Sequence, residues 1–160
     1  MKFEKFVKSL ASTGTIYERE NGERWLASLT VYMKIPPLTK SITCAQIKKM
    51  PKVIEDIIAE YGKVEMATLT AAYMPIANGG IKDCEREYTV ESGAAKCVLY
   101  NDDWSLIEKE DMTQLLYSYD LDTDTQKVKA MLVKVLPFTP TDPDELVGII
   151  FPIFEMKGDE

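Results

Sequence analysis

The turn formed by Glu20, Asn21 and Gly22 constrains the fold of this chain more than any other feature. It lies within residues 14–37, between two segments that alternate apolar and polar side chains, which predicts a β-hairpin. A two-residue Asn-Gly loop would place Glu20 opposite Glu23 and two arginines opposite each other, and directly opposed like charges are unfavourable. We therefore predict a three-residue loop with Gly22 in the left-handed position of a G1 bulge. This loop pairs Arg19 with Glu23, Glu18 with Arg24, Tyr17 with Trp25, and Ile16 with Leu26.

Two apolar stripes with helical spacing predict helices on either side of this hairpin. The first stripe predicts a helix that begins near Phe3 and ends before Gly14, and it consists of Phe3, Phe6, Val7, Leu10 and Ala11. The second predicts a helix over residues 51–61, with Pro51 at its first position. Residues 43–46 have the spacing of a capping box, so a short helical turn is expected before Met50.

The remaining segments predict strands and one more helix. Alternating or β-branched stretches predict strands at residues 83–90, 96–100, 128–136 and 146–154. Residues 64–75 fit either a strand or a helix, whereas the apolar residues of 112–119 have helical spacing. Together these elements predict one α+β domain over residues 1–156, with about three helices packed on a mainly antiparallel sheet, and a loose tail at 157–160.

The composition limits the kinds of chemistry open to the chain. It has 160 residues, of which 46% are hydrophobic and 28% charged, as in a single globular domain. The absence of histidine excludes Ser-His and Cys-His triads and histidine-ligated zinc or haem. The net charge of −7 disfavours a general phosphate-binding surface. We expect no cofactor, because neither the GxGxxG nor the GxxxxGK[ST] spacing occurs.

The cysteines and the apolar runs indicate where such a chain works. Cys44, Cys84 and Cys97 are odd in number and lack a CxxC spacing, which is typical of a reduced, cytoplasmic protein. Cys84 and Cys97 are interpreted as buried thiols that face each other across paired strands. No apolar run reaches the roughly 18 residues of a membrane helix, so no membrane partner is expected.

Three aspartates resemble part of a calcium-binding loop. Asp120, Asp122 and Asp124 occupy positions 1, 3 and 5 of such a loop. Thr125 stands where the loop needs glycine, and Met131 stands where it needs a bidentate glutamate. We therefore interpret this segment as a solvated connection and expect no metal site.

The segment LYNDDWSLIEKED at residues 99–111 is the strongest candidate for an interaction surface. One interpretation places a hairpin turn at residues 101–103, with Asp111 capping a helix that starts near Met112. The other has a capping box at residues 105–108 and a helix from Leu106. We prefer the hairpin, which makes Asp102, Asp103 and Trp104 the candidate interaction residues, because aromatic loop residues often anchor interfaces.

Two resemblances accompany these patterns. The segments ERWLASLTVYMKIP and YNDDWSLIEKEDM resemble small proteins of phages and prophages of Gram-positive bacteria, which implies no particular activity. TDPDELVGIIFPIFE is similar to the terminal strand of bacterial DNA sliding clamps, and KCVLYNDDWSLIEK resembles a strand-turn-strand of the same family. The clamp resemblance implies an oligomeric ring with lysines on inner helices, for which the candidates are Lys2, Lys5, Lys8, Lys48, Lys49 and Lys52.

These observations leave three hypotheses. The leading one is a non-enzymatic, cytoplasmic protein of phage or mobile-element origin that binds another protein or a second copy of itself. The first alternative is a clamp-like DNA replication accessory, and only this alternative includes DNA as a partner. The second alternative is an enzyme in which Asp102 or Asp103 meets a distant carboxylate or tyrosine.

Overall fold

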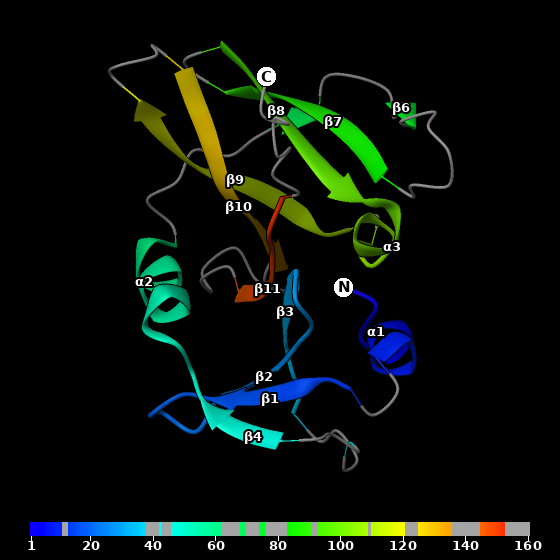
Figure 1. The fold of residues 1–160 in the computed structure, drawn as a ribbon, viewed down its shortest axis with the longest axis vertical. Coiled ribbons are helices and arrows are strands. Elements are labelled where there is room, and N and C mark those ends of the chain that lie inside the picture. The colour runs from blue at the N-terminus through cyan, green and yellow to red at the C-terminus, as the bar shows by residue number, and fades with distance from the viewer. Residues whose placement is uncertain are drawn as a thin grey trace, which may run out of the picture.

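The computed structural model describes residues 1–10, 13–37, 42, 46–61, 68–69, 74–75, 83–90, 93–108, 110–120, 125–135 and 145–152. Within them, a mixed seven-stranded sheet has the strand order β4-β1-β2-β3-β11-β10-β9 (Figure 1). Its strands are β1 (Thr15–Glu18), β2 (Arg24–Ala27), β3 (Val31–Lys34), β4 (Gln46–Lys49), β9 (Met112–Asp120), β10 (Thr125–Val135) and β11 (Glu145–Ile150). Neighbouring strands are antiparallel, except that β4 runs parallel to β1.

The hairpin of β1 and β2 has the predicted register. Tyr17 pairs with Trp25 and Glu18 with Arg24, and the backbone N–H of Arg19 donates to the carbonyl of Glu23 at 2.8 Å. Gly22 has φ of +88°, the left-handed conformation that a three-residue loop requires. Asn21 supports the turn, because its Oδ1 accepts the backbone N–H of Glu23 at 3.0 Å.

Both faces of the sheet are buried along its inner strands. Consecutive residues of a strand point to opposite faces, and Met131 and Leu132 accordingly belong to two different core clusters. The first cluster includes Phe6 of α1 (Phe3–Leu10), and the second includes Ile54 and Ile57 of α2 (Lys52–Glu60). The two predicted helices are confirmed, and they cover opposite faces of the sheet. Pro51 is the extended N-cap residue before α2 and not its first helical residue as predicted, because its ψ of 146° lies outside the helical range.

A second sheet lies beside the first. It contains β5 (Thr68–Leu69), β6 (Met74–Pro75), β7 (Asp83–Val90) and β8 (Gly93–Tyr100), and β7 pairs with each of the other three. Leu99 at the end of β8 joins the first core cluster, which ties the second sheet to the first. Cys84 pairs with Leu99 and Cys97 with Arg86, so the two cysteines are not directly opposite each other. Cys44 lies outside the described residues.

Two of the sequence predictions about helices are wrong. Residues 112–119 belong to strand β9, in which Leu115 and Leu116 are buried in opposite clusters. Adjacent apolar residues suit a strand buried on both faces as well as they suit a helix, so their spacing could not separate the two. Gln46–Lys49 forms strand β4 because it pairs with β1, whereas a helical turn was expected there; residues 43–45 lie outside the described residues.

The fold is α+β, and several predicted strands are confirmed. The strands predicted at residues 83–90, 96–100 and 128–136 correspond to β7, β8 and β10, and β11 covers the first part of the strand predicted at 146–154. Of residues 64–75, the structure describes only the short strands β5 and β6. The predicted tail at 157–160 lies outside the described residues.

Candidate protein-binding surface

The three candidate interaction residues lie in a short helix. Asp102, Asp103 and Trp104 belong to α3 (Asn101–Trp104), which follows β8 directly, so the preferred hairpin turn is wrong. The helical turn is extended by a hydrogen bond from the Ser105 hydroxyl to the carbonyl of Asp102 at 2.7 Å. Asp102 is exposed, whereas Trp104 is half-buried against the first core cluster.

Asp103 attaches this helix to the sheet. Its Oδ2 accepts the hydroxyl of Thr30, in the turn between β2 and β3, at 2.6 Å. Burial raises the pKa of Asp103 above its usual value, the hydrogen bond from Thr30 opposes that shift, and the nearby charge of Asp102 adds to it. The geometry therefore gives Asp103 a positioning role between α3 and the sheet.

Asp111 is also placed differently from its predicted role as a helix cap. Its carboxylate accepts the backbone N–H of Glu108 at 2.8 Å and lies 2.8 Å from the N-terminal ammonium group. The alternative interpretation, a helix that begins at Leu106, is wrong as well, because Leu106 lies in a turn and is buried in the first core cluster. This segment connects α3 to β9.

A groove of about 550 Å³, lined by apolar and hydroxyl-bearing side chains, opens near α3. Leu29, in the turn between β2 and β3, is 99% exposed, and Tyr100 is 41% exposed. The groove is lined by Leu10, Thr13, Thr15, Tyr17, Ala27, Ser28, Leu29, Thr30 and Tyr100. Leu29 is thus an apolar side chain fully presented to solvent.

Strand β4 forms a second exposed surface at one end of the seven-stranded sheet. Among the described strands, only β1 pairs with it, and all four of its side chains are exposed, including Ile47 at 57%. Met50 donates its backbone N–H to the carbonyl of Glu18 at 2.9 Å. Because N–H and C=O groups alternate in direction along a strand, those of Ile47 and Lys49 point away from β1. The outer edge of β4 therefore presents backbone donors and acceptors.

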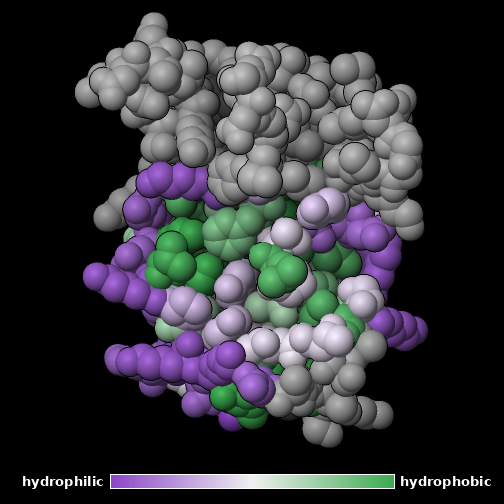
Figure 2. Space-filling model, in the orientation of Figure 1, coloured by the Kyte–Doolittle hydropathy of each residue, from purple (hydrophilic) through white to green (hydrophobic). Residues whose placement is uncertain are grey.

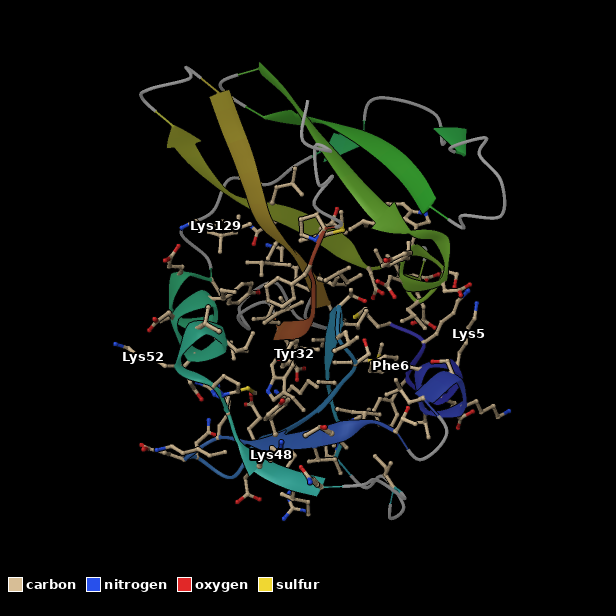
Figure 3. The ribbon with its side chains drawn as sticks, in the orientation of Figure 1. Lys5, Phe6, Tyr32, Lys48, Lys52 and Lys129 are labelled. Atoms are coloured by element: carbon tan, nitrogen blue, oxygen red, sulfur yellow. The ribbon has the colours of Figure 1, made fainter. Side chains whose placement is uncertain are left out.

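Positive charge gathers at this edge. Lys48, Lys49 and Lys52 are exposed, and none of them makes a salt bridge with another described residue. Hydrophilic side chains cover this part of the surface at the lower left of Figure 2, and Figure 3 labels Lys48 on β4 and Lys52 at the start of α2. A locally basic edge thus occurs on a chain whose net charge is −7.

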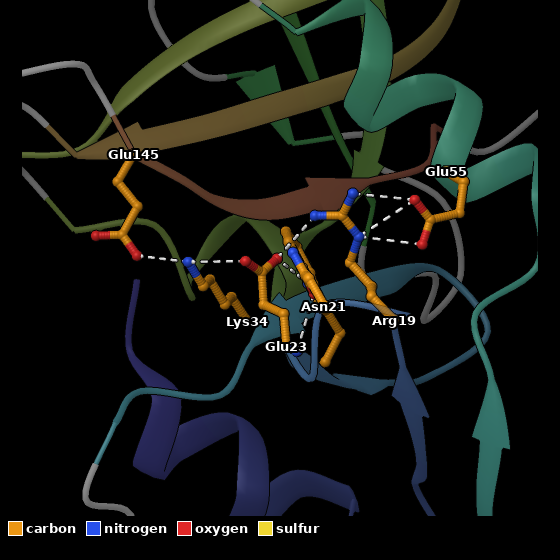
Figure 4. A network of polar contacts seen from close by, with 7 residues as sticks. Arg19, Asn21, Glu23, Lys34, Glu55 and Glu145 are labelled. Atoms are coloured by element: carbon orange, nitrogen blue, oxygen red, sulfur yellow. Dashed lines mark hydrogen bonds and ion pairs between the residues drawn. The ribbon is translucent and has the colours of Figure 1, made fainter.

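A hollow of about 680 Å³ lies between β4, the hairpin turn and the start of α2. Arg19 joins two of these walls, because its guanidinium donates to both carboxylate oxygens of Glu55 on α2 at 3.0 to 3.2 Å (Figure 4). It also donates to Glu23 at 3.2 Å. The hydrogen bond to Glu55 is the main reason that the pKa of Arg19 is raised. Arg19 therefore fixes the position of α2 relative to the hairpin.

The polar network continues from Glu23 across the sheet. Burial acts to raise the pKa of Glu23, but hydrogen bonds from Trp25 and Arg19 and the charge of Lys34 outweigh it, so the pKa is lowered. The Trp25 indole N–H donates to Glu23 at 2.9 Å, and Lys34 also contacts Glu145 of β11 at 2.8 Å. The charges of Arg19, Glu23 and Glu55 are thereby compensated within the fold.

The lysines named for the clamp-like alternative do not share one surface. Lys5 on α1 and Lys52 on α2 point to opposite sides of the sheet, because the two helices cover opposite faces (Figure 3). Lys5 also donates to the Ser105 hydroxyl at 2.8 Å. Lys48 and Lys49 lie on a strand and not on a helix.

Within the described residues, no group of three or more cysteine and carboxylate side chains is arranged to hold a metal ion. Asp120 ends β9, whereas Asp122 and Asp124 lie outside the described residues. In the same part of the chain, no helix is long and apolar enough to cross a membrane.

Comparison with known proteins found no matching family model, no matching curated protein and no matching solved structure. The case for function therefore depends on the surfaces themselves. The sequence analysis assigned Lys48, Lys49 and Lys52 to helices, which is right for Lys52 and wrong for the other two, and it missed the exposed edge. The alternation of Gln46, Ile47 and Lys48 was a signal for a strand, although a weak one over four residues.

Proposed function

We propose that this protein binds another protein by accepting an extended segment of its partner as an additional strand beside β4. The observation that carries this proposal is the outer edge of β4, which no other described strand covers. Strand addition to an exposed sheet edge is a common mode of peptide recognition, in which the backbone supplies affinity and side chains supply specificity. It agrees with the expectation that the protein acts by binding a protein partner.

The β4 edge is held in place by the rest of the fold, which supports a role in binding. Met50 follows β4 directly, is only 4% exposed and belongs to the second core cluster. Four backbone pairs align β4 with β1. The strand is therefore held in an extended conformation before any partner arrives, so binding does not have to order it.

The backbone alone supports only modest affinity. Ile47 and Lys49 offer two N–H and two C=O groups, and each hydrogen bond contributes about 0.5–1.5 kcal/mol net. Four such bonds total about 2–6 kcal/mol, before the cost of association is subtracted. Side-chain contacts with Ile47 and the lysines must supply the remainder.

The test uses proline variants of two adjacent lysines, in which the lost N–H groups point in opposite directions. Lys49→Pro removes an N–H that points outward, and proline is tolerated at such edge positions. Lys48→Pro removes an N–H that points to β1 and serves as the control for disruption of the sheet. A displayed library of random decapeptides is first selected on the unaltered protein, and the enriched peptides are then measured against each variant.

The proposal predicts that Lys49→Pro retains its circular dichroism spectrum and melting transition but loses the selected peptides. It also predicts that Leu29→Ser, a change in the turn between β2 and β3, leaves peptide binding unchanged. Peptides that bind Lys49→Pro as tightly as the unaltered protein would show that the β4 edge is not the binding site.

A further inference from the structure

We infer that the segment accepted beside β4 is acidic and has an apolar residue next to two consecutive carboxylates. The inference depends on the proposed strand addition and specifies the partner's chemistry. It starts from the charges at the edge. Lysines occupy three of the five positions from 48 to 52, although the whole chain carries a net charge of −7.

Two of the acids near these lysines are engaged in ion pairs with arginines. Glu18 accepts a hydrogen bond from Arg24 at 2.7 Å, and Glu55 is held by Arg19. Glu20, in the hairpin turn, is exposed and lines the same hollow as Lys49. Asp56, also exposed, lies one helical turn after Lys52 on α2. Three lysines beside the two acids Glu20 and Asp56 leave an excess of positive charge, which a partner of opposite charge would complement.

The directions of the side chains on β4 predict which residue types the partner segment carries at each position. Ile47 pairs with Ile16, whose side chain lies in the first core cluster, whereas Lys48 pairs with Tyr17 on the opposite face. Lys49 shares the face of Ile47 because side chains alternate. An added strand therefore meets a lysine on each face, and an apolar side chain beside one of them.

Directly opposed side chains on neighbouring strands are about 4.5–5.5 Å apart at Cβ, close enough for charge pairing. The matching segment places an apolar residue opposite Ile47 and carboxylates opposite Lys48 and Lys49. If the partner strand runs parallel to β4, its sequence in this segment is apolar-acidic-acidic. If it runs antiparallel, the sequence is acidic-acidic-apolar.

The same charges disfavour a second copy of β4 as the occupant. Two β4 edges paired with each other would bring lysines close to lysines, and like charges across a strand pair are destabilising. Lysine on an edge strand is a common device against such self-pairing. The edge therefore discriminates between copies of itself and an acidic partner.

The test compares three synthetic decapeptides with the central residues Val-Glu-Glu, Val-Gln-Gln and Val-Lys-Lys. Fluorescence anisotropy at low salt measures their binding to the full-length protein. Two cross-strand charge pairs predict that the Val-Glu-Glu peptide binds about 2- to 30-fold more tightly than its Val-Gln-Gln isostere. The difference shrinks as added salt screens the pairs.

Charge-reversal variants locate the effect. The double change Lys48→Glu and Lys49→Glu should transfer the preference to the Val-Lys-Lys peptide, while Lys2→Glu with Lys8→Glu, on the opposite face, should leave the preference unchanged. If the reversed variant does not fold, Lys48→Gln with Lys49→Gln should reduce the preference to near parity.

Three results would overturn the inference, and they differ in what else they affect. If the glutamate and glutamine peptides bind equally and Lys49→Pro abolishes this binding, the partner segment is not acidic, but strand addition at β4 still holds. If every peptide binds Lys49→Pro as well as it binds the unaltered protein, both the acidic partner and strand addition at β4 are refuted. A single-stranded oligonucleotide that binds these lysines more tightly than the Val-Glu-Glu peptide makes the partner a nucleic acid.

Discussion

Replacing Arg19 by alanine should loosen the attachment of α2 to the hairpin beside the proposed binding edge. Arg19 donates three hydrogen bonds to Glu55 and one to Glu23, and its side chain is 21% exposed. The variant removes all four bonds. The residues left behind are partly exposed, at 35% for Glu55 and 24% for Glu23, so water hydrates their carboxylates.

The magnitude follows from this intermediate burial. Hydrogen bonds to charged groups contribute about 1.5–3 kcal/mol when well protected, whereas exposed ion pairs contribute about 0–1 kcal/mol. We therefore expect Arg19→Ala to lower the free energy of unfolding by about 2 kcal/mol. For a chain of this length, that corresponds to a decrease in melting temperature of about 4–8 °C.

Urea denaturation of a double-mutant cycle provides the assay. Arg19→Ala, Glu55→Gln and the double variant isolate the pairwise coupling, which we expect to be about 1 kcal/mol. The pKa of Glu23 is lowered in the folded state, so its ionised carboxylate contributes fully to the free energy of unfolding above pH 4.5, the unfolded pKa. This contribution is lost as the pH falls through the folded pKa. A coupling below about 0.3 kcal/mol at neutral pH would refute the assigned role of Arg19.

Three further changes test other parts of the fold. Gly22→Ala should cost about 1–2 kcal/mol in a urea titration, because φ is +88° and no atom lies within 4 Å of the new Cβ; an unchanged midpoint would argue against the left-handed turn. Leu132→Ala, at a fully buried site, should cost about 2–5 kcal/mol, whereas Leu29→Ala should change stability by less than about 0.5 kcal/mol; similar losses at both sites would contradict the assigned burial. Asp103→Asn keeps an acceptor for Thr30 but cannot ionise. Since burial raises the folded pKa of Asp103, wild-type stability falls as the pH rises from 3.8 to that pKa, so the variant should gain relative to wild type over this window; a relative loss would contradict the shift.

The hairpin was predictable in detail because its information is local. The charges on Arg19 and Glu23 were sufficient to choose the loop length, and the φ of Gly22 confirmed that choice. The helices at either side were predictable for a similar reason, since an amphipathic stripe of eight or nine residues carries its own period.

The errors arose where tertiary contacts decide the structure. Strand β9 is buried on both faces, so its apolar residues lose the alternation that marks a half-exposed strand. Strand β4 has only four exposed residues and is defined by its pairing with β1, a partner some thirty positions away in the chain. The sequence analysis therefore also missed the candidate binding surface, because Lys48 and Lys49 form such a surface only when they lie on an exposed strand edge.

The most direct test of strand addition at β4 is amide hydrogen exchange, measured by NMR residue by residue with and without the Val-Glu-Glu decapeptide. In the free protein the amide of Lys48, which points to β1, should exchange slowly, while those of Ile47 and Lys49 should exchange rapidly. Saturating peptide should slow Ile47 and Lys49 and leave Lys48 unchanged. Unchanged exchange at Ile47 and Lys49 while the peptide is bound would contradict the account.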